Sequence, residues 1–122
     1  MKRLLVPASL ALAVLVPALQ AQTPPTSKLD VRQKTALRCS VAFALVAEGQ
    51  AKGDPAMTDY PPLGERGREF FVRSSAQLMD ETGMDREQIA ALLASEIEEL
   101  RAPGALKDVM PPCLLLLDAS GL

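Results

Sequence analysis

The stretch from Ala36 to Ala47 constrains the fold more than any other part of the sequence. Arranged as an α-helix, it is apolar on almost every side, and only Arg38 and Ser40 interrupt it. A helix that is apolar nearly all round is usually surrounded by other elements. This stretch also contains Cys39, one of only two cysteines in the chain. The sequence therefore predicts a small helical domain packed around this central helix.

Residues 1–21 have the three parts of a secretory signal peptide. Lys2 and Arg3 supply the positive start, an uncharged Leu/Ala/Val-rich run follows, and Ala21 supplies a small residue for cleavage. The alternative is an uncleaved membrane anchor, which needs about 20 apolar residues. The run here is shorter and contains Pro7 and Pro17. We therefore expect cleavage after Ala21, no stable membrane anchor afterwards, and a periplasmic or secreted protein.

The charge and the residue types exclude several classes of function. The chain has a net charge of -2, and removal of Lys2 and Arg3 makes the mature chain two charges more negative. A nucleic-acid partner would need a basic patch, so none is expected. The chain contains no histidine, which removes the commonest general base and the commonest metal ligand.

The two cysteines, Cys39 and Cys113, are predicted to form one disulfide, because an exported protein enters an oxidising compartment. The alternative is a reactive thiol at Cys113, which follows two prolines and is expected to begin the last helix. A helix N-terminus lowers the pKa of a thiol. In that case the protein would be a thiol-based redox protein or an enzyme that uses Cys113.

The first half of the mature chain divides into a tether, a helix, a loop and a second helix. Residues 22–29 are polar and contain prolines, which is typical of a disordered tether. The single helical domain, 30–122, begins with a helix over 31–50, capped by Asp30 and Gln33. Residues 53–62 contain three prolines and are predicted to be an irregular loop, held to the core by Met57 and Tyr60.

The second predicted helix spans 62–82, with a proline in its first turn and Gly83 just beyond its end. Gly64 and Gly67 are expected to allow close helix packing rather than to bind an anion, since no strand precedes them. The alternative role of Tyr60, to line a pocket, is less favoured than that of a loop anchor.

The third predicted helix has the clearest boundaries. Asp85 and Gln88 form a capping box, and Met84 and Ile89 are placed for a hydrophobic staple. An apolar stripe follows at helical spacing, and Pro103 with Gly104 ends the helix. The stripe consists of Ile89, Leu92, Leu93, Ile97 and Leu100.

The C-terminal part is predicted to be a short turn over 105–110, a break at Pro111 and Pro112, and a short last helix. That helix carries a run of leucines that is either buried or open to a protein partner. The fold class is therefore all-α, with three main helices, a short C-terminal one and one disulfide. The run consists of Leu114, Leu115, Leu116 and Leu117.

No catalytic, cofactor-binding or metal-binding residue is predicted. Glu96, Glu98 and Glu99 are expected to form a solvated acidic face, because isolated buried charges are costly. The carboxylates lack the spacing of a calcium loop, and two cysteines without histidine are a poor zinc ligand set. Ser74 and Ser75 have no histidine or nearby lysine to activate them.

These features favour a non-catalytic binding or stress-related interaction module in the periplasm. In size and compartment the layout is similar to small periplasmic acid-stress chaperones, which are helical and carry one disulfide. Two alternatives remain open. One is the thiol-based protein or enzyme that uses Cys113, and the other is a structural subunit of an envelope complex that buries its leucine run against a partner.

Overall fold

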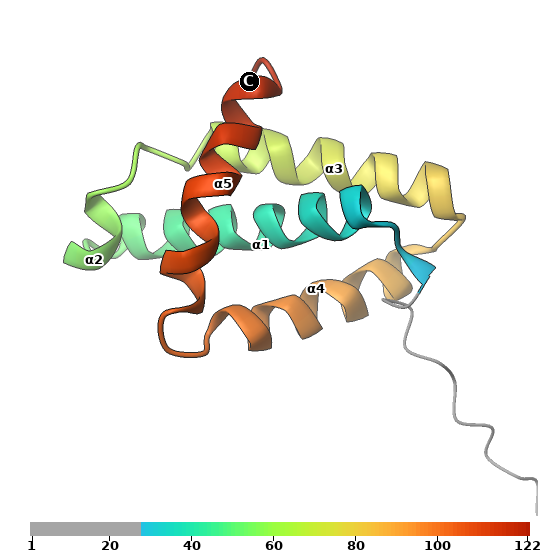
Figure 1. Cartoon of the computed structure of the whole chain (residues 1–122), viewed down its shortest axis with the longest axis horizontal. Helices are drawn as coiled ribbons and strands as arrows, with labels where there is room; N and C mark the ends of the chain where they lie inside the picture. The colour runs from blue at the N-terminus through green and yellow to red at the C-terminus, as the bar shows by residue number, and fades with distance from the viewer. Residues whose placement is uncertain (1–27) are drawn as a thin grey trace, which may run out of the picture.

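A computed structural model describes residues 28–122, which form five α-helices with α1 at the centre (Figure 1). No strand occurs among these residues, so the predicted all-α class is confirmed. α3 packs along α1, α4 packs on its other side, and α5 crosses it steeply. The leader and residues 22–27 of the tether lie outside the described residues. The helices are α1 (Val31–Ala51), α2 (Pro55–Thr58), α3 (Arg66–Thr82), α4 (Arg86–Leu100) and α5 (Ala105–Ala119).

α1 begins where its capping residues predict. The Asp30 carboxylate accepts a hydrogen bond of 2.7 Å from the Gln33 backbone N–H, and the Gln33 side chain accepts one of 3.0 Å from the Asp30 N–H. Phe43 and Val46 are fully buried, as a central helix requires. Ala44 faces solvent, so α1 is not enclosed on every side.

The buried residues form two apolar clusters at opposite ends of α1. The first lies at its C-terminal half, where α3, α4 and α5 contribute Phe70, Leu100, Met110 and Leu117. The second lies at its start and joins α1, α3 and α4. Leu29 belongs to this second cluster and is 5% exposed, so the end of the predicted tether is wrong. The second cluster consists of Leu29, Leu37, Leu78, Met84, Ile89 and Leu92.

The loop after α1 differs from the prediction in two ways. Residues 55–58 form one helical turn, α2, because Asp54 caps it and Pro55 suits the first helical position. α3 then starts at Arg66, four residues later than predicted. Leu63, which precedes α3, is fully buried in the first apolar cluster, and its N–H donates a hydrogen bond of 3.1 Å to the Gln50 side chain on α1.

Gly67 sets the distance between α1 and α3. A Cβ atom at this position would lie 3.0 Å from the Cβ of Phe43, so only glycine fits without a shift. The predicted close packing is therefore confirmed at Gly67. The predicted close packing is wrong at Gly64, where no atom of the described residues would lie within 4 Å of an added Cβ atom.

α4 confirms its predicted start. The Asp85 side chain accepts a hydrogen bond of 2.9 Å from the Gln88 N–H, and the Gln88 side chain accepts one of 3.0 Å from the Asp85 N–H. Met84 and Ile89 are both buried in the second cluster, as a staple requires.

α5 is one continuous helix of 15 residues with Pro111 and Pro112 inside it, so the predicted break and the short last helix are wrong. Both prolines are exposed, whereas Met110, Cys113 and Leu117 are fully buried. The free energy gained by burying this apolar face is greater than the free energy lost with the backbone hydrogen bonds that the two prolines cannot make. Among residues 28–122, no helix has the length and hydropathy that a membrane span requires.

Candidate functional site

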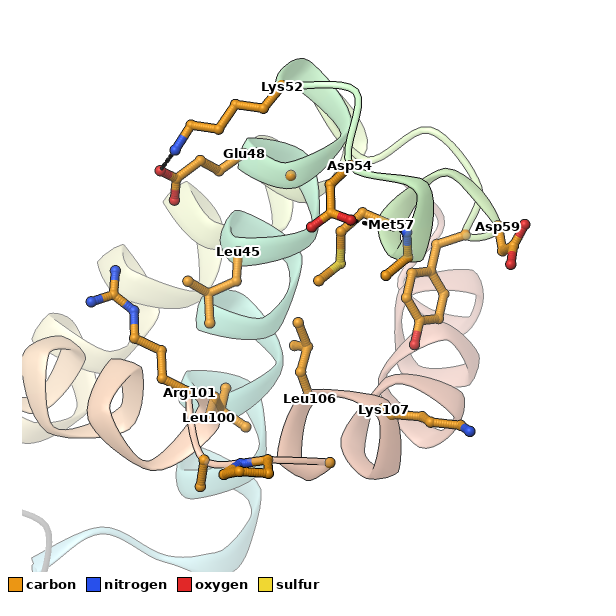
Figure 2. Close-up of a pocket in the computed structure, with 16 residues that line it drawn as sticks. Leu45, Glu48, Lys52, Asp54, Met57, Asp59, Leu100, Arg101, Leu106 and Lys107 are labelled. Carbon is orange, nitrogen blue, oxygen red and sulfur yellow. Dashed lines mark hydrogen bonds and ion pairs between the residues drawn. The ribbon is translucent and has the colours of Figure 1, made fainter.

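A pocket of about 800 Å³ lies between the end of α1, α2 and the turn from α4 to α5 (Figure 2). We call it the α1–α2 pocket. Its floor is apolar and its rim carries both signs of charge. The floor consists of Leu45, Met57, Tyr60, Leu100 and Leu106. The charged rim consists of Glu48, Lys52, Asp54, Asp59, Arg101 and Lys107.

Met57 and Tyr60 pack against the first apolar cluster, which confirms their predicted role as loop anchors. They also line the pocket, so the less favoured role of Tyr60 is present as well. Gly49 makes this packing possible. A Cβ atom at Gly49 would lie 2.4 Å from the Cγ of Met57 and 3.1 Å from its Cβ, so the Met57 side chain could not keep its position.

The side chain of Gln50 fixes the segment that forms the pocket wall. Its Nε2 donates to the carbonyl oxygens of Met57, Tyr60 and Pro61 at 3.1, 3.2 and 2.9 Å. Its Oε1 accepts a hydrogen bond of 3.1 Å from the backbone N–H of Leu63. The Gln50 amide therefore satisfies the Tyr60 and Pro61 carbonyls and the Leu63 N–H, for which no backbone partner occurs among residues 28–122, and adds a donor to the Met57 carbonyl at the end of α2.

The charges on the rim differ in how they are paired. Lys52 Nζ lies 2.6 Å from Glu48 Oε1, and this hydrogen bond lowers the pKa of Glu48. The Asp54 carboxylate accepts one hydrogen bond of 3.0 Å from the Ala56 N–H. Across residues 28–122, Arg101 makes no ion pair within 4 Å.

A second polar group joins α1 to α4. Arg38 Nε lies 3.0 Å from Glu96 Oε2, and Arg38 also forms an ion pair with Glu99. Glu96 is 8% exposed, so the predicted solvated face is wrong at this residue. The guanidinium of Arg38 compensates the buried carboxylate, which would otherwise be costly. Glu98 and Glu99 are exposed, as predicted.

A third polar group joins α1 to α3 through Glu81. Gln33, Gln77 and Arg32 each donate a hydrogen bond to its carboxylate, and together they lower its pKa to about 2. Each of these side chains is on the surface or close to it, so the group ties helices together without forming a pocket.

The two cysteines lie at disulfide distance, with their Sγ atoms 2.05 Å apart and their Cα atoms 5.2 Å apart. Cys39 is 2% exposed and Cys113 is fully buried. Cys113 lies in the middle of α5 and not at a helix start, so the premise of a thiol activated by a helix N-terminus is wrong.

The leucine run divides between core and surface. Leu117 is fully buried, and Leu114 and Leu116 pack against the first apolar cluster. Leu115 is 72% exposed. The run therefore presents one largely exposed leucine.

Within the described range 28–122, no cluster of three or more potential metal ligands occurs. Ser74 and Ser75 are half-buried in the middle of α3. The chain matches no family model, and it has no significant similarity to a curated protein or to a solved structure.

Sequence reasoning did not find the α1–α2 pocket, although two signals for it are present. Gly49 falls inside a predicted helix, where glycine is unfavourable and indicates a close approach. Asp54 and Pro55 form an N-cap and first-position pair that predicts the start of a helix.

Proposed function

We propose that this chain is an exported, non-catalytic binding module and that the α1–α2 pocket is its ligand site. The observation that carries the proposal is the pocket itself: an apolar floor below a rim of charges, with a volume of about 800 Å³. Small-ligand sites typically have volumes of about 300–1,000 Å³ and combine apolar walls with a few polar groups.

The way the pocket is built supports a preformed site. Gly49 lets α2 lie directly on α1, and the four contacts of the Gln50 amide hold the wall between α2 and α3. A site that is fixed before binding loses less conformational entropy when a ligand enters.

The thiol-based alternative has less support, because both sulfurs are buried and Cys113 does not begin a helix. Exchange with an external thiol requires access to a sulfur atom. The pairing of Cys39 with Cys113 agrees with an oxidising compartment.

Methionine methyl NMR tests the proposal on protein exported by cells that express the full chain. Met57 lines the pocket, and Met84 lies in the second cluster at the other end of α1. A ligand from a library of small amphipathic molecules should shift the Met57 methyl signal and leave that of Met84 unchanged.

Two variants separate binding in the pocket from binding elsewhere. Ala102→Trp places a large ring at the pocket edge, and Ala90→Trp places the same ring on an exposed position of α4 outside the pocket. The ligand should lose its effect on Met57 in Ala102→Trp and keep it in Ala90→Trp. The proposal would be contradicted if no library member shifts the Met57 methyl signal, or if a ligand shifts that signal equally in Ala102→Trp.

A further inference from the structure

The charges of the α1–α2 pocket are divided between two sides of its apolar floor. Figure 2 shows the Asp54 carboxylate extending into the hollow above Met57, whereas Asp59 and Lys107 extend away from it. Arg101 lies beyond Leu45, on the same edge as Glu48. The Asp54 carboxylate therefore extends into the hollow, and the Arg101 guanidinium lies at its outer edge beyond Leu45, with apolar side chains between the two groups.

The Asp54 carboxylate and the Arg101 guanidinium can each bind a group of opposite charge on a ligand. Asp54 receives one hydrogen bond, from Ala56 to Oδ1, and no other protein group within 28–122 donates to its second oxygen. Glu48, the carboxylate on the edge near Arg101, is already bonded to Lys52. The guanidinium of Arg101 presents donors in a fork that matches a carboxylate.

We propose that the α1–α2 pocket binds a short apolar peptide with both ends free, its ammonium group at Asp54 and its carboxylate at Arg101. This inference rests on the proposed function, since it names the ligand class of the same site. Leu45, Met57 and Leu106 contact the apolar side chains of the peptide, and Tyr60 adds an aromatic wall at the side of α2. An amphiphile that carries only a negative charge, such as a fatty-acid anion, would place its apolar tail against the Asp54 carboxylate, which is unfavourable.

The test uses trileucine as the probe in three forms: with free ends, acetylated at its N-terminus, and amidated at its C-terminus. Titration of the Met57 methyl signal gives the three dissociation constants. Each blocked form should bind about 1.5-fold to fivefold more weakly, because each lost contact is a solvent-exposed charge pair.

Two charge-removing variants assign each end of the peptide to its partner. Asp54→Asn keeps the cap of α2, since asparagine caps as well as aspartate, and should bind the free and acetylated forms equally. Arg101→Gln should bind the free and amidated forms equally. Asp80→Asn and Arg86→Gln, which change exposed residues outside the pocket, should retain both preferences.

The outcomes separate this inference from the proposed function. Equal binding of all three forms, or preferences that Asp54→Asn and Arg101→Gln leave intact, overturns the assignment of the two ends. If trileucine fails to shift Met57 while another library member shifts it, the peptide is wrong and the pocket remains a binding site. If neither trileucine nor the library shifts Met57, both proposals fail.

Discussion

Replacing Gln50 with alanine removes one side chain that holds four backbone groups between α2 and α3. These groups are the carbonyls of Met57, Tyr60 and Pro61 and the N–H of Leu63. An amide nitrogen carries two hydrogens, so at most two of the three carbonyls are fully bonded at once. Together with the bond from Leu63, the side chain contributes about three hydrogen bonds.

Each such bond contributes about 0.5–1.5 kcal/mol, and solvent can reach part of this segment, so Gln50→Ala should lower the free energy of unfolding by about 2 kcal/mol. Urea denaturation measures this loss. Hydrogen exchange should also show faster exchange of the Leu63 amide, because its acceptor is gone. Gln50→Glu keeps that acceptor and the shape but removes both donors, so it should weaken the hold on the carbonyls while the Leu63 amide stays protected.

Gln77→Ala is the matched control, because Gln77 is exposed and, among residues 28–122, its side chain bonds only to Glu81. It removes one exposed hydrogen bond, so it should lower the free energy of unfolding by about 0.5–1 kcal/mol, less than Gln50→Ala does. A loss for Gln50→Ala as small as that of the control, or unchanged exchange of the Leu63 amide, would refute the structural role assigned to Gln50.

Three further predictions concern the bridge, the second cluster and pH. The bridge closes a loop with a sequence separation of 74, so Cys113→Ala should cost about 4.5 kcal/mol by chain entropy. The Cys39→Ala/Cys113→Ala double variant should be little less stable than Cys113→Ala, because both lack the same bond. A melting temperature that reductant does not change would contradict the bridge. Asp85→Ala should lower the free energy of unfolding by about 1 kcal/mol, as loss of an N-cap does. Leu92→Ala should lower it by about 2–5 kcal/mol, as loss of a core side chain does. If urea denaturation gives similar losses for the two variants, Leu92 lies outside the core. Glu81 has its pKa lowered from 4.5 to about 2, so its contribution is present above pH 4.5 and is lost as the pH falls towards 2. Glu81→Gln should therefore flatten the decrease in stability over that range, and an unchanged pH profile would show that the three donors do not stabilise the carboxylate.

The starts of α1 and α4 could be predicted from sequence because their signals are local. In each case an aspartate cap and a glutamine three residues later satisfy each other's backbone groups. Such a capping box depends on four consecutive residues and needs no knowledge of the remaining fold. The pairing of Cys39 with Cys113 was equally accessible, because a chain with two cysteines allows one intramolecular bridge.

The burial of Glu96 could not be predicted, because its partner Arg38 is distant in sequence and lies on another helix. Only the packing of α1 against α4 brings the two together. The α1–α2 pocket could not be predicted for the same reason, because its walls come from segments that only the tertiary packing brings together: α1, α2 and the turn between α4 and α5. The sequence indicates the close approach at Gly49 but not which side chain makes it.

The continuity of α5 shows how tertiary packing overrides a local signal. A proline inside a helix removes a hydrogen bond and costs about 3 kcal/mol, which favours the break predicted at Pro111 and Pro112. Both rings face solvent, while Met110 and Cys113 on either side of them are fully buried. Burying a large apolar side chain contributes about 1.5–3 kcal/mol, and Leu117 adds to this on the same face. The helix that results also carries Leu106 into the floor of the α1–α2 pocket, so the packing that keeps α5 whole also completes the proposed ligand site.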